Sequence, residues 1–255
     1  MIDMLLVKKS TAIRTVLLAA LVAAIEVICR FGLVSPNTLI SPSEMAAALV
    51  AILRSGRFND QIWSTISNVG AAIVLSVVLG IIAGVILHAI PRVRQAVQPF
   101  LASCYAIPGF IFYVPLLGVF GLNDIPLISI GFILAAPSMI LATINGLDRI
   151  PPVFLRVSRL CQTGDLAAVF LVKLPCAAPY LFSGVRLCVA YAFIGVLASE
   201  FILSDRGVGY SIAFAYNDFD TRTMYALMLL IILLVTGANM ALQAWENRLM
   251  VRRRR

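Results

Sequence analysis

Long apolar runs, separated by short polar and basic segments, dominate the pattern of this chain. A helix needs about 20 mainly apolar residues to cross about 30 Å of hydrocarbon. Stretches of that kind occur around residues 13–34, 63–87, 100–121, 126–147, 181–203 and 224–245. The pattern therefore predicts an all-α membrane protein with about six transmembrane helices.

Composition supports this prediction, because 61% of the 255 residues are hydrophobic and only 13% are charged. Soluble domains average about 45–50% apolar and about a quarter charged residues. Little sequence remains for a soluble domain, so we expect one transmembrane domain over 1–255, with its core at about 63–247. The first apolar stretch carries Glu26 and Arg30 and has no clean small-residue cleavage site after it, so we expect a retained helix rather than a signal peptide.

The distribution of Lys and Arg predicts the orientation. In a six-span chain with a cytoplasmic N-terminus, most basic residues fall in cytoplasmic segments, and the outer segments hold only Arg54, Arg57, Arg206 and Arg222. The positive-inside rule then places both termini in the cytoplasm. The net charge of +8 does not indicate nucleic-acid binding, because the basic residues flank spans and face anionic lipid without an aromatic-basic stripe.

Candidate catalytic or metal-binding residues are scarce. The five cysteines lie in or beside different spans without CxxC spacing, and we interpret them as small apolar residues. An intramembrane hydrolase needs a histidine within the membrane interior, but His88, the only histidine, lies at the end of the second apolar stretch. The sequence therefore argues against an enzyme and against a metal site.

The third apolar stretch is interrupted by Pro99, Pro108 and Pro115, and Gly109 follows the second of these. Each proline removes a backbone donor, and broken backbone persists in a membrane only where protein or a water-filled cavity satisfies the freed groups. Aromatic residues gather around this break. We expect a translocation pathway here, with core packing of a kinked helix as the alternative; its candidate residues are Tyr105, Pro108, Phe110 and Tyr113.

Charged residues within spans need a partner or water. Glu26 and Arg30 form an i, i+4 pair, and Arg186 is close enough to the start of the fifth stretch to reach the cytoplasmic side. Glu200 lies roughly 21 Å further along that helix, so it cannot pair with Arg186. We expect Arg206 as a candidate partner of Glu200, which either makes a structural contact at an outer gate or binds substrate directly.

The segment at about 148–173 is polar and basic and is too long for a simple hairpin turn. Asp165, after Gly164, can cap a short amphipathic helix that begins with Leu166. The next span then begins with Pro175 and Pro179 near its start. This arrangement predicts a cytoplasmic docking helix for a soluble partner, followed by a proline-marked turn into the membrane.

Several of these motifs, in this order, resemble the inner-membrane permeases of ATP-binding-cassette importers, especially the nitrate, sulfonate and taurine branch. The resemblance covers about residues 63–245. It rests on "AIPGFIFYVPLLGVFGLND", "INGLDRIPP", "LPCAAPYLFSGVRL", "FIGVLASEF" and "GVGYSI".

The resemblance implies a type I importer permease core in a bacterial inner membrane, with a cytoplasmic coupling helix that seats in a groove on an ATPase subunit. It implies ATP-binding-cassette ATPase subunits, a periplasmic solute-binding protein and a second permease copy as partners. The solute would be a small polar or anionic compound such as a sulfonate, taurine or nitrate. Because the chain lacks GxxxxGK followed by Ser or Thr, ATP and Mg would be bound by the partner, and we expect this chain to bind no cofactor.

The loop departs from the family pattern. Aligned on Leu174 and Pro175, the family's Glu-Ala-Ala falls on Arg156, Val157 and Ser158, and its glycine falls on Gln162. Either the loop docks on a co-adapted ATPase, or this subunit pairs with a more typical permease in a heterodimer. The coupling residues implied by the resemblance are Arg156, Ser158, Arg159, Gln162, Gly164, Asp165 and Leu166.

An ion-coupled secondary transporter is the alternative function. Such transporters often show inverted repeats and membrane-embedded acidic residues. We find no convincing repeat between the halves of this chain, and its buried charges are few.

Overall fold

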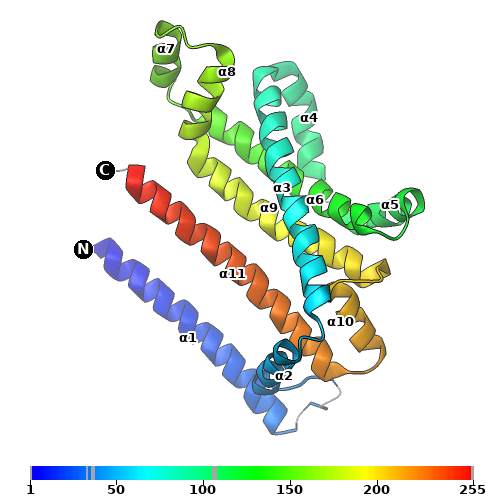
Figure 1. Ribbon diagram of the computed structural model, residues 1–255. Helices are drawn as coiled ribbons and strands as arrows, with labels where there is room; N and C mark the ends of the chain where they lie inside the picture. The colour runs from blue at the N-terminus through cyan, green and yellow to red at the C-terminus, as the bar shows by residue number, and fades with distance from the viewer. Residues whose placement is uncertain (1, 33, 36–37, 105–107, 254–255) are drawn as a thin grey trace. The chain divides into compact units, whose positions relative to one another are not determined.

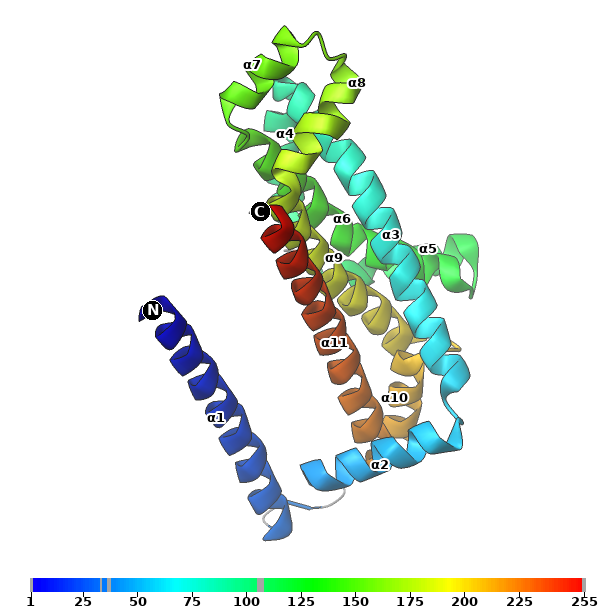
Figure 2. The same cartoon turned by 60° about the vertical axis from the view of Figure 1, so that its left-hand side comes forward.

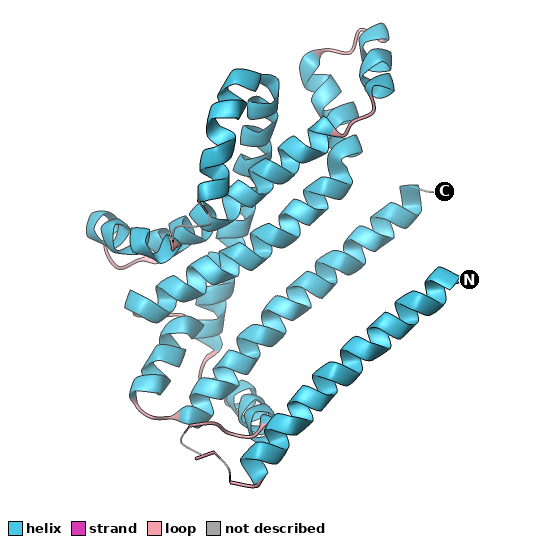
Figure 3. Cartoon of the chain, turned by 180° about the vertical axis from the view of Figure 1, so that it is seen from behind, coloured by secondary structure: helices cyan, strands magenta, loops and turns pink. Residues whose placement is uncertain are grey.

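The computed structural model describes residues 2–32, 34–35, 38–104 and 108–253. Within these ranges the chain consists of helices joined by loops (Figure 3). The helices are α1 (Ile2–Arg30), α2 (Pro42–Ser55), α3 (Asn59–Ala89), α4 (Pro91–Ser103), η1 (Gly109–Phe112), α5 (Tyr113–Phe120), α6 (Asp124–Asp148), α7 (Pro152–Leu160), α8 (Asp165–Ala168), η2 (Val169–Lys173), α9 (Leu174–Leu203), α10 (Val208–Asn217) and α11 (Thr221–Arg253).

Four of the predicted spans correspond to helices that are long and apolar enough to cross a membrane. These are Asn59–Ala89, Asp124–Asp148, Leu166–Leu203 and Thr221–Arg248 among the residues that the structure describes. The first apolar stretch lies largely in α1. The all-α membrane fold predicted from the apolar pattern is confirmed.

The third apolar stretch is not one continuous helix. Helix α4 ends at Ser103, and helical structure resumes as the 3₁₀ turn η1 at Gly109, directly after Pro108. Pro99 lies inside α4 and Pro115 lies in the first turn of α5, where a missing N–H costs no helical hydrogen bond. The predicted backbone break is therefore confirmed at Pro108 alone among the three prolines.

The chain forms two compact units, which are described separately. One contains residues 1–59 and 211–232, and the other contains residues 60–210 and 233–255. That the whole chain acts as one permease domain stays a prediction.

Helices α3, α6 and α9 form the core of the second unit and cross one another in Figure 1. Buried Val69 and Ala72 of α3 meet Met139 of α6 and Ala192 and Val196 of α9, among others. Helices α6 and α9 approach closely at two glycines. A Cβ on Gly195 would lie 2.9 Å from the Cα of Gly131, so only glycine allows this crossing.

Helices α7 and α8 lie together beyond one end of α9, near α4 (Figures 1 and 2). The predicted turn at Pro175 is wrong, because α8, η2 and α9 form one helical run from Asp165 to Leu203. The π-helical turn η2 precedes Pro175, and the N–H of Leu174 bonds to the carbonyl of Val169. This wider turn accommodates the proline without ending the helix.

In the first unit, Glu26 and Arg30 form the predicted ion pair, with 2.7 Å between Arg30 Nε and Glu26 Oε1. Glu26 also accepts hydrogen bonds from the N–H and the hydroxyl of Ser43, at 3.0 and 2.7 Å. Ser41 caps α2, and the N–H of Ser41 lies 3.4 Å from the Glu44 carboxylate in a reciprocal capping box. The contact from Glu26 to Ser43 joins the end of α1 to the start of α2.

Candidate functional site

Glu200 is the most enclosed acidic side chain in the described part of the chain, with 1% of its surface exposed. Its carboxylate accepts a hydrogen bond from the Thr65 hydroxyl, which lies 2.9 and 2.8 Å from the two oxygens. It also accepts from the N–H of Gly209 at 2.9 Å. The N–H of Val208 donates to the same Thr65 hydroxyl oxygen at 2.8 Å. Thr65 therefore bridges Glu200 and the first turn of α10.

The sequence "GVGYSI" explains how α10 can begin directly against this carboxylate. Gly207 has φ +101°, a conformation that residues with a side chain rarely adopt. A Cβ at Gly207 would collide with the Glu200 carboxyl group, and a Cβ at Gly209 would lie 2.8 Å from the carbonyl oxygen of Leu197. The N–H of Gly207 donates to Gln61 Oε1 at 2.5 Å. Both glycines are thus required for the turn to pack onto Glu200.

The predicted partner of Glu200 is wrong. Arg206 instead lies 3.7 Å from Asp124 Oδ2 and 3.4 Å from Asp205 Oδ1. The α10 N-terminus occupies the space beside Glu200, and its oriented N–H groups provide the positive end of a helix dipole. Asn68 of α3 donates to Asp124 at 3.3 Å, so a second polar layer adjoins this cluster.

The other charge predicted within the fifth span, Arg186, forms an ion pair with Glu246 of α11. Its reach to the cytoplasmic side stays a prediction. Phe182, one helical turn before Arg186, and Trp245, directly before Glu246, pack edge to face with their ring centroids 6.1 Å apart. These contacts join α9 to the C-terminal half of α11.

Of the predicted pathway residues, the structure describes the side chains of Pro108, Tyr113 and Glu200, and among these only Pro108 is exposed. Tyr105 lies outside the described residues, and for Phe110 only the backbone is described. Pro108 is exposed, whereas Tyr113 is 1% exposed and packs against Leu127 and Ile130. The Tyr113 hydroxyl donates to the carbonyl of Leu203 at 3.0 Å. Tyr113 and Glu200 are both enclosed in this structure, and their role in a pathway stays a prediction.

The predicted coupling residues lie on or between α7 and α8. Arg156 and Arg159 are exposed on α7, Ser158 is buried, and Gln162 and Gly164 lie in the exposed turn. Asp165 begins α8, and Leu166 is 77% exposed. The longer amphipathic helix of this segment is α7, not the helix expected after Asp165, which has only four residues before the π-helical turn.

An unusual backbone conformation closes α7. Gln162 has φ 51°, in the left-handed region where glycine is normally found. Its N–H bonds to the carbonyl of Arg159, and the N–H of Thr163 bonds to that of Ser158, which is the Schellman pattern. The position where the family resemblance expects glycine therefore keeps the glycine conformation with a different residue.

Sequence reasoning missed an ionic cluster where α3, α4 and α6 meet. The Arg94 guanidinium donates to both carboxylate oxygens of Asp148, at 2.8 and 2.5 Å. His88 Nδ1 lies 3.3 Å from Asp148 Oδ1 without a well-aligned hydrogen bond. Both basic residues were interpreted only as span-flanking residues. The acidic residue at the end of an apolar run, Asp148, is the signal that could have revealed the pairing.

The described residues contain no group of three or more His, Cys, Asp or Glu side chains that could hold a metal ion. The Glu200 cluster has its hydrogen bonds directed inward, to Thr65 and to the backbone of α10. These hydrogen bonds hold α3, α9 and the start of α10 together, so the cluster suits a structural role. The exposed apolar surface on α7 and α8 suits contact with another protein.

Comparison with known proteins identifies relatives among transport permeases. The glycine betaine/proline betaine transport system permease protein ProW of Escherichia coli (strain K12) is 28% identical over 158 residues, which cover 61% of this chain and 45% of that protein. The nitrate import permease protein NrtB of Synechococcus elongatus is 27% identical over 157 residues, covering 62% of this chain and 56% of that protein. The chain thus spans about half the length of these two relatives.

A probable ABC transporter permease protein of Brucella melitensis is 24% identical over 208 residues and is matched over most of its length, 85%. Among solved structures, the inward-facing MetNI methionine ABC transporter contains a chain with a TM-score of 0.65 and 21% sequence identity. The match covers 75% of this chain and 94% of that one. It confirms the fold predicted from the resemblance, a type I importer permease core.

A family model matches residues 76–255, which is more than half of the chain. The matched region begins within α3, after Thr65, and includes the α7–α8 segment, Glu200, α10 and α11. The chain therefore belongs to the family described as the binding-protein-dependent transport system inner membrane component.

Proposed function

We propose that this chain is the permease subunit of an ATP-driven importer. It would move a small polar or anionic solute, in the class of sulfonates, taurine, nitrate or related organic compounds, from the periplasm to the cytoplasm. Family membership and the nitrate permease relative support the proposal. The betaine permease relative extends the candidate solutes to zwitterionic compounds.

The observation that carries this proposal is the exposed apolar surface of the α7–α8 segment, which we call the coupling hairpin and define as residues 152–173. Apolar side chains on α7 and on the α8–η2 part of this hairpin are more than half exposed. They include Val153, Leu160, Leu166, Phe170 and Leu171. An apolar surface on a polar, basic loop indicates a protein contact, because lipid would not tolerate the charged neighbours.

This surface supports a docked ATPase, and family membership supports the other proposed partners. An ATPase subunit would seat on the coupling hairpin and bind ATP and Mg, and a solute-binding protein would deliver the solute from the other side. Both termini would lie in the cytoplasm with the hairpin, as the positive-inside rule predicts. A second permease chain would complete the pathway, as an identical copy or as a different subunit.

Rigidity of the link between the hairpin and the membrane supports a role in transmitting motion. The helical run from Asp165 to Leu203 has no loop between the hairpin and the Glu200 cluster. A displacement of α8 by an ATPase would therefore move α9 directly, and α9 carries the residues that hold the first turn of α10.

The experiment replaces Leu166 by Asp, which places a charge on the exposed apolar surface, and uses Leu166→Met as the matched control. We expect Leu166→Asp to abolish co-purification of the ATPase from the native membrane while the chain still inserts. Leu166→Met should retain the ATPase. An intact complex with unchanged solute-stimulated ATP hydrolysis in Leu166→Asp would show that the ATPase docks elsewhere.

A further inference from the structure

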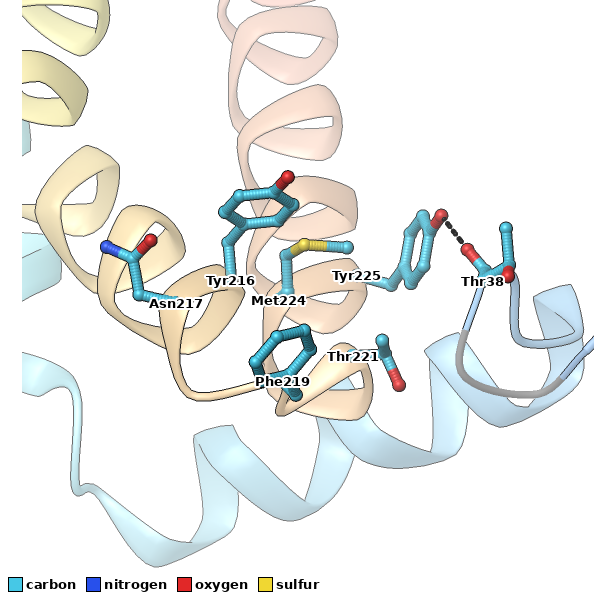
Figure 4. A pocket seen from close by; sticks show the side chains of 7 residues that line it. All are labelled: Thr38, Tyr216, Asn217, Phe219, Thr221, Met224 and Tyr225. Carbon is cyan, nitrogen blue, oxygen red and sulfur yellow. Dashed lines mark hydrogen bonds between the residues drawn. The ribbon is translucent and has the colours of Figure 1, made fainter.

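A cavity of about 370 Å³ lies within the unit formed by residues 1–59 and 211–232. It is bounded by the end of α10, the start of α11 and the segment before α2. Its lining consists of Thr38, Tyr216, Asn217, Phe219, Thr221, Met224 and Tyr225. Figure 4 shows the rings of Tyr216, Phe219 and Tyr225 grouped around the Met224 side chain. Cavities of this size accommodate small organic ligands.

The backbone at Phe219 is held in a conformation that its side chain disfavours. Phe219 has φ 58°, in the left-handed region, where a bulky residue is a genuine outlier. Its N–H bonds to the carbonyl of Tyr216 and the N–H of Asp220 bonds to that of Ala215, so Phe219 occupies the Schellman position that glycine normally fills. Its ring is 89% exposed and gains little from burial. An outlier of this kind points to a functional role of the side chain.

The opposite wall is fixed by a hydrogen bond. The Tyr225 hydroxyl donates to the carbonyl of Thr38 at 2.7 Å, as Figure 4 shows. This bond occupies the hydroxyl group and leaves the face of the ring as the binding surface. The Tyr216 side chain, 63% exposed, contributes a further aromatic ring.

No charged side chain lines the cavity. Charged residues around it are of both signs, because Asp218 and Asp220 flank Phe219 in the sequence and Arg57 and Arg222 act on Asp220. Attraction of a cation therefore depends on the aromatic rings and not on a net charge. Burial raises the pKa of Asp220, but hydrogen bonds from Thr223 and the charges of Arg57 and Arg222 lower it by more, so this pKa lies below its usual value. Asp220 is therefore ionised at neutral pH. Arg57 is stacked over the ring of Phe58, 5.3 Å from its centroid.

We propose that this cavity binds a small organic cation with an alkylated ammonium group. The negative faces of aromatic rings attract such a cation, and its methyl groups fill an apolar cavity that ammonium ions with a full hydration shell would not enter. The polar side chains of Thr38, Asn217 and Thr221 can contact a polar substituent on the same ligand. This inference does not depend on the proposed importer function.

The first test compares choline with 3,3-dimethylbutan-1-ol, in which carbon replaces the charged nitrogen. Binding of each compound to the purified full chain in lipid nanodiscs is measured by isothermal titration calorimetry. We expect saturable binding of choline and an affinity for the neutral compound that is at least about tenfold lower. Equal affinities would identify a merely apolar pocket and overturn the proposal, as would the absence of saturable choline binding.

The second test uses Phe219→Gly, which relieves the backbone and removes the ring. We expect the affinity for choline to fall about three- to thirtyfold while the melting temperature of the protein stays unchanged or rises. Phe31→Ala removes another exposed ring of the same unit, 78% exposed and outside the cavity lining, and should leave choline binding unchanged. Full choline affinity in a folded Phe219→Gly protein would contradict the site.

Discussion

The hydroxyl of Thr65 has two functions, because it donates to Glu200 and accepts from Val208. Removing it leaves a buried carboxylate and a buried N–H each short of a partner. We expect Thr65→Val to lower the free energy of unfolding by about 2–4 kcal/mol, since each unsatisfied buried group costs about 1–3 kcal/mol. Thermal unfolding of the detergent-solubilised protein measures this change.

The matched control is Thr65→Ser, which keeps the hydroxyl and removes only a methyl group. We expect it to lose no more than about 1 kcal/mol. If Thr65→Ser and Thr65→Val were equally destabilised, packing of the methyl group rather than the hydrogen bonds would hold this joint together.

Gln162 provides a second prediction at the residue scale. The left-handed conformation costs a residue with a Cβ about 1–2 kcal/mol, and glycine avoids this steric cost. Glycine also has more conformational freedom in the unfolded chain, which offsets part of the stabilisation. We expect Gln162→Gly to stabilise the end of α7 by about 0.5–1 kcal/mol. Slower hydrogen exchange of the Thr163 amide, which bonds to Ser158, measures this effect.

Gln162→Ala serves as the control, because alanine retains the Cβ and should leave the exchange rate of Thr163 close to that of the unaltered chain. Faster exchange of Thr163 in Gln162→Ala than in the unaltered chain would mean that a contact of the glutamine side chain holds the turn, and exchange in Gln162→Gly no slower than in Gln162→Ala would contradict the expected gain. In the first case Gln162 would stabilise the turn rather than strain it.

At the scale of elements, the crossing of α6 and α9 is set by backbone contact at Gly131 and Gly195. A Cβ at Gly195 would lie 2.9 Å from the Gly131 Cα and 3.0 Å from the carbonyl oxygen of Ile130, and backbone atoms cannot rotate away. We expect Gly195→Ala to destabilise the protein by about 1–3 kcal/mol, as overpacking of a core does. Thermal unfolding is again the measurement.

Gly237 of α11 has open space where a Cβ would be placed, so Gly237→Ala is the control. We expect it to be neutral or slightly stabilising, because alanine favours the helix over glycine. A Gly195→Ala protein as stable as Gly237→Ala would show that the helix crossing at Gly195 tolerates a larger distance than the structure has.

Hydrophobic patterning predicted most of the helical elements, because spans of about 20 apolar residues have few alternatives in a membrane. The prolines were harder to interpret. Pro108 lies at a break, whereas Pro175 and Pro179 lie within one helical run, because a π-helical turn at 169–173 accommodates the first of them. A sequence does not reveal such a turn, which depends on where the freed carbonyl groups find partners.

Charged residues show the same limit at the candidate site. The pair Glu26 and Arg30 is local in sequence and was predicted, whereas Glu200 with Thr65 and Arg186 with Glu246 are separated by long stretches of chain. Arg206 was the nearest basic residue to Glu200 in sequence, but the helix N-terminus of α10 supplies the positive partner instead. Long-range partners follow from helix packing, which periodicity alone does not determine.

At the scale of the whole molecule, we propose that this chain is a membrane subunit that depends on a partner ATPase for energy. The coupling hairpin has Arg156 where the family resemblance implies an acidic residue. We propose either that this hairpin docks on a co-adapted ATPase or that the chain pairs with a more typical permease in a heterodimer. Native mass spectrometry of the complex from its own membrane separates these proposals. Two copies of this chain with two ATPases would exclude the heterodimer.

The most direct measurement of the central claim is solute uptake into proteoliposomes that contain the complete complex isolated through this chain. With the solute-binding protein outside and ATP enclosed, we expect uptake of the solute that the binding protein carries, and no uptake when ATP is replaced by a non-hydrolysable analogue. Dissipating proton and sodium gradients should leave the rate unchanged. Uptake that persists without ATP hydrolysis and stops when an ion gradient is dissipated would contradict the account and identify an ion-coupled transporter.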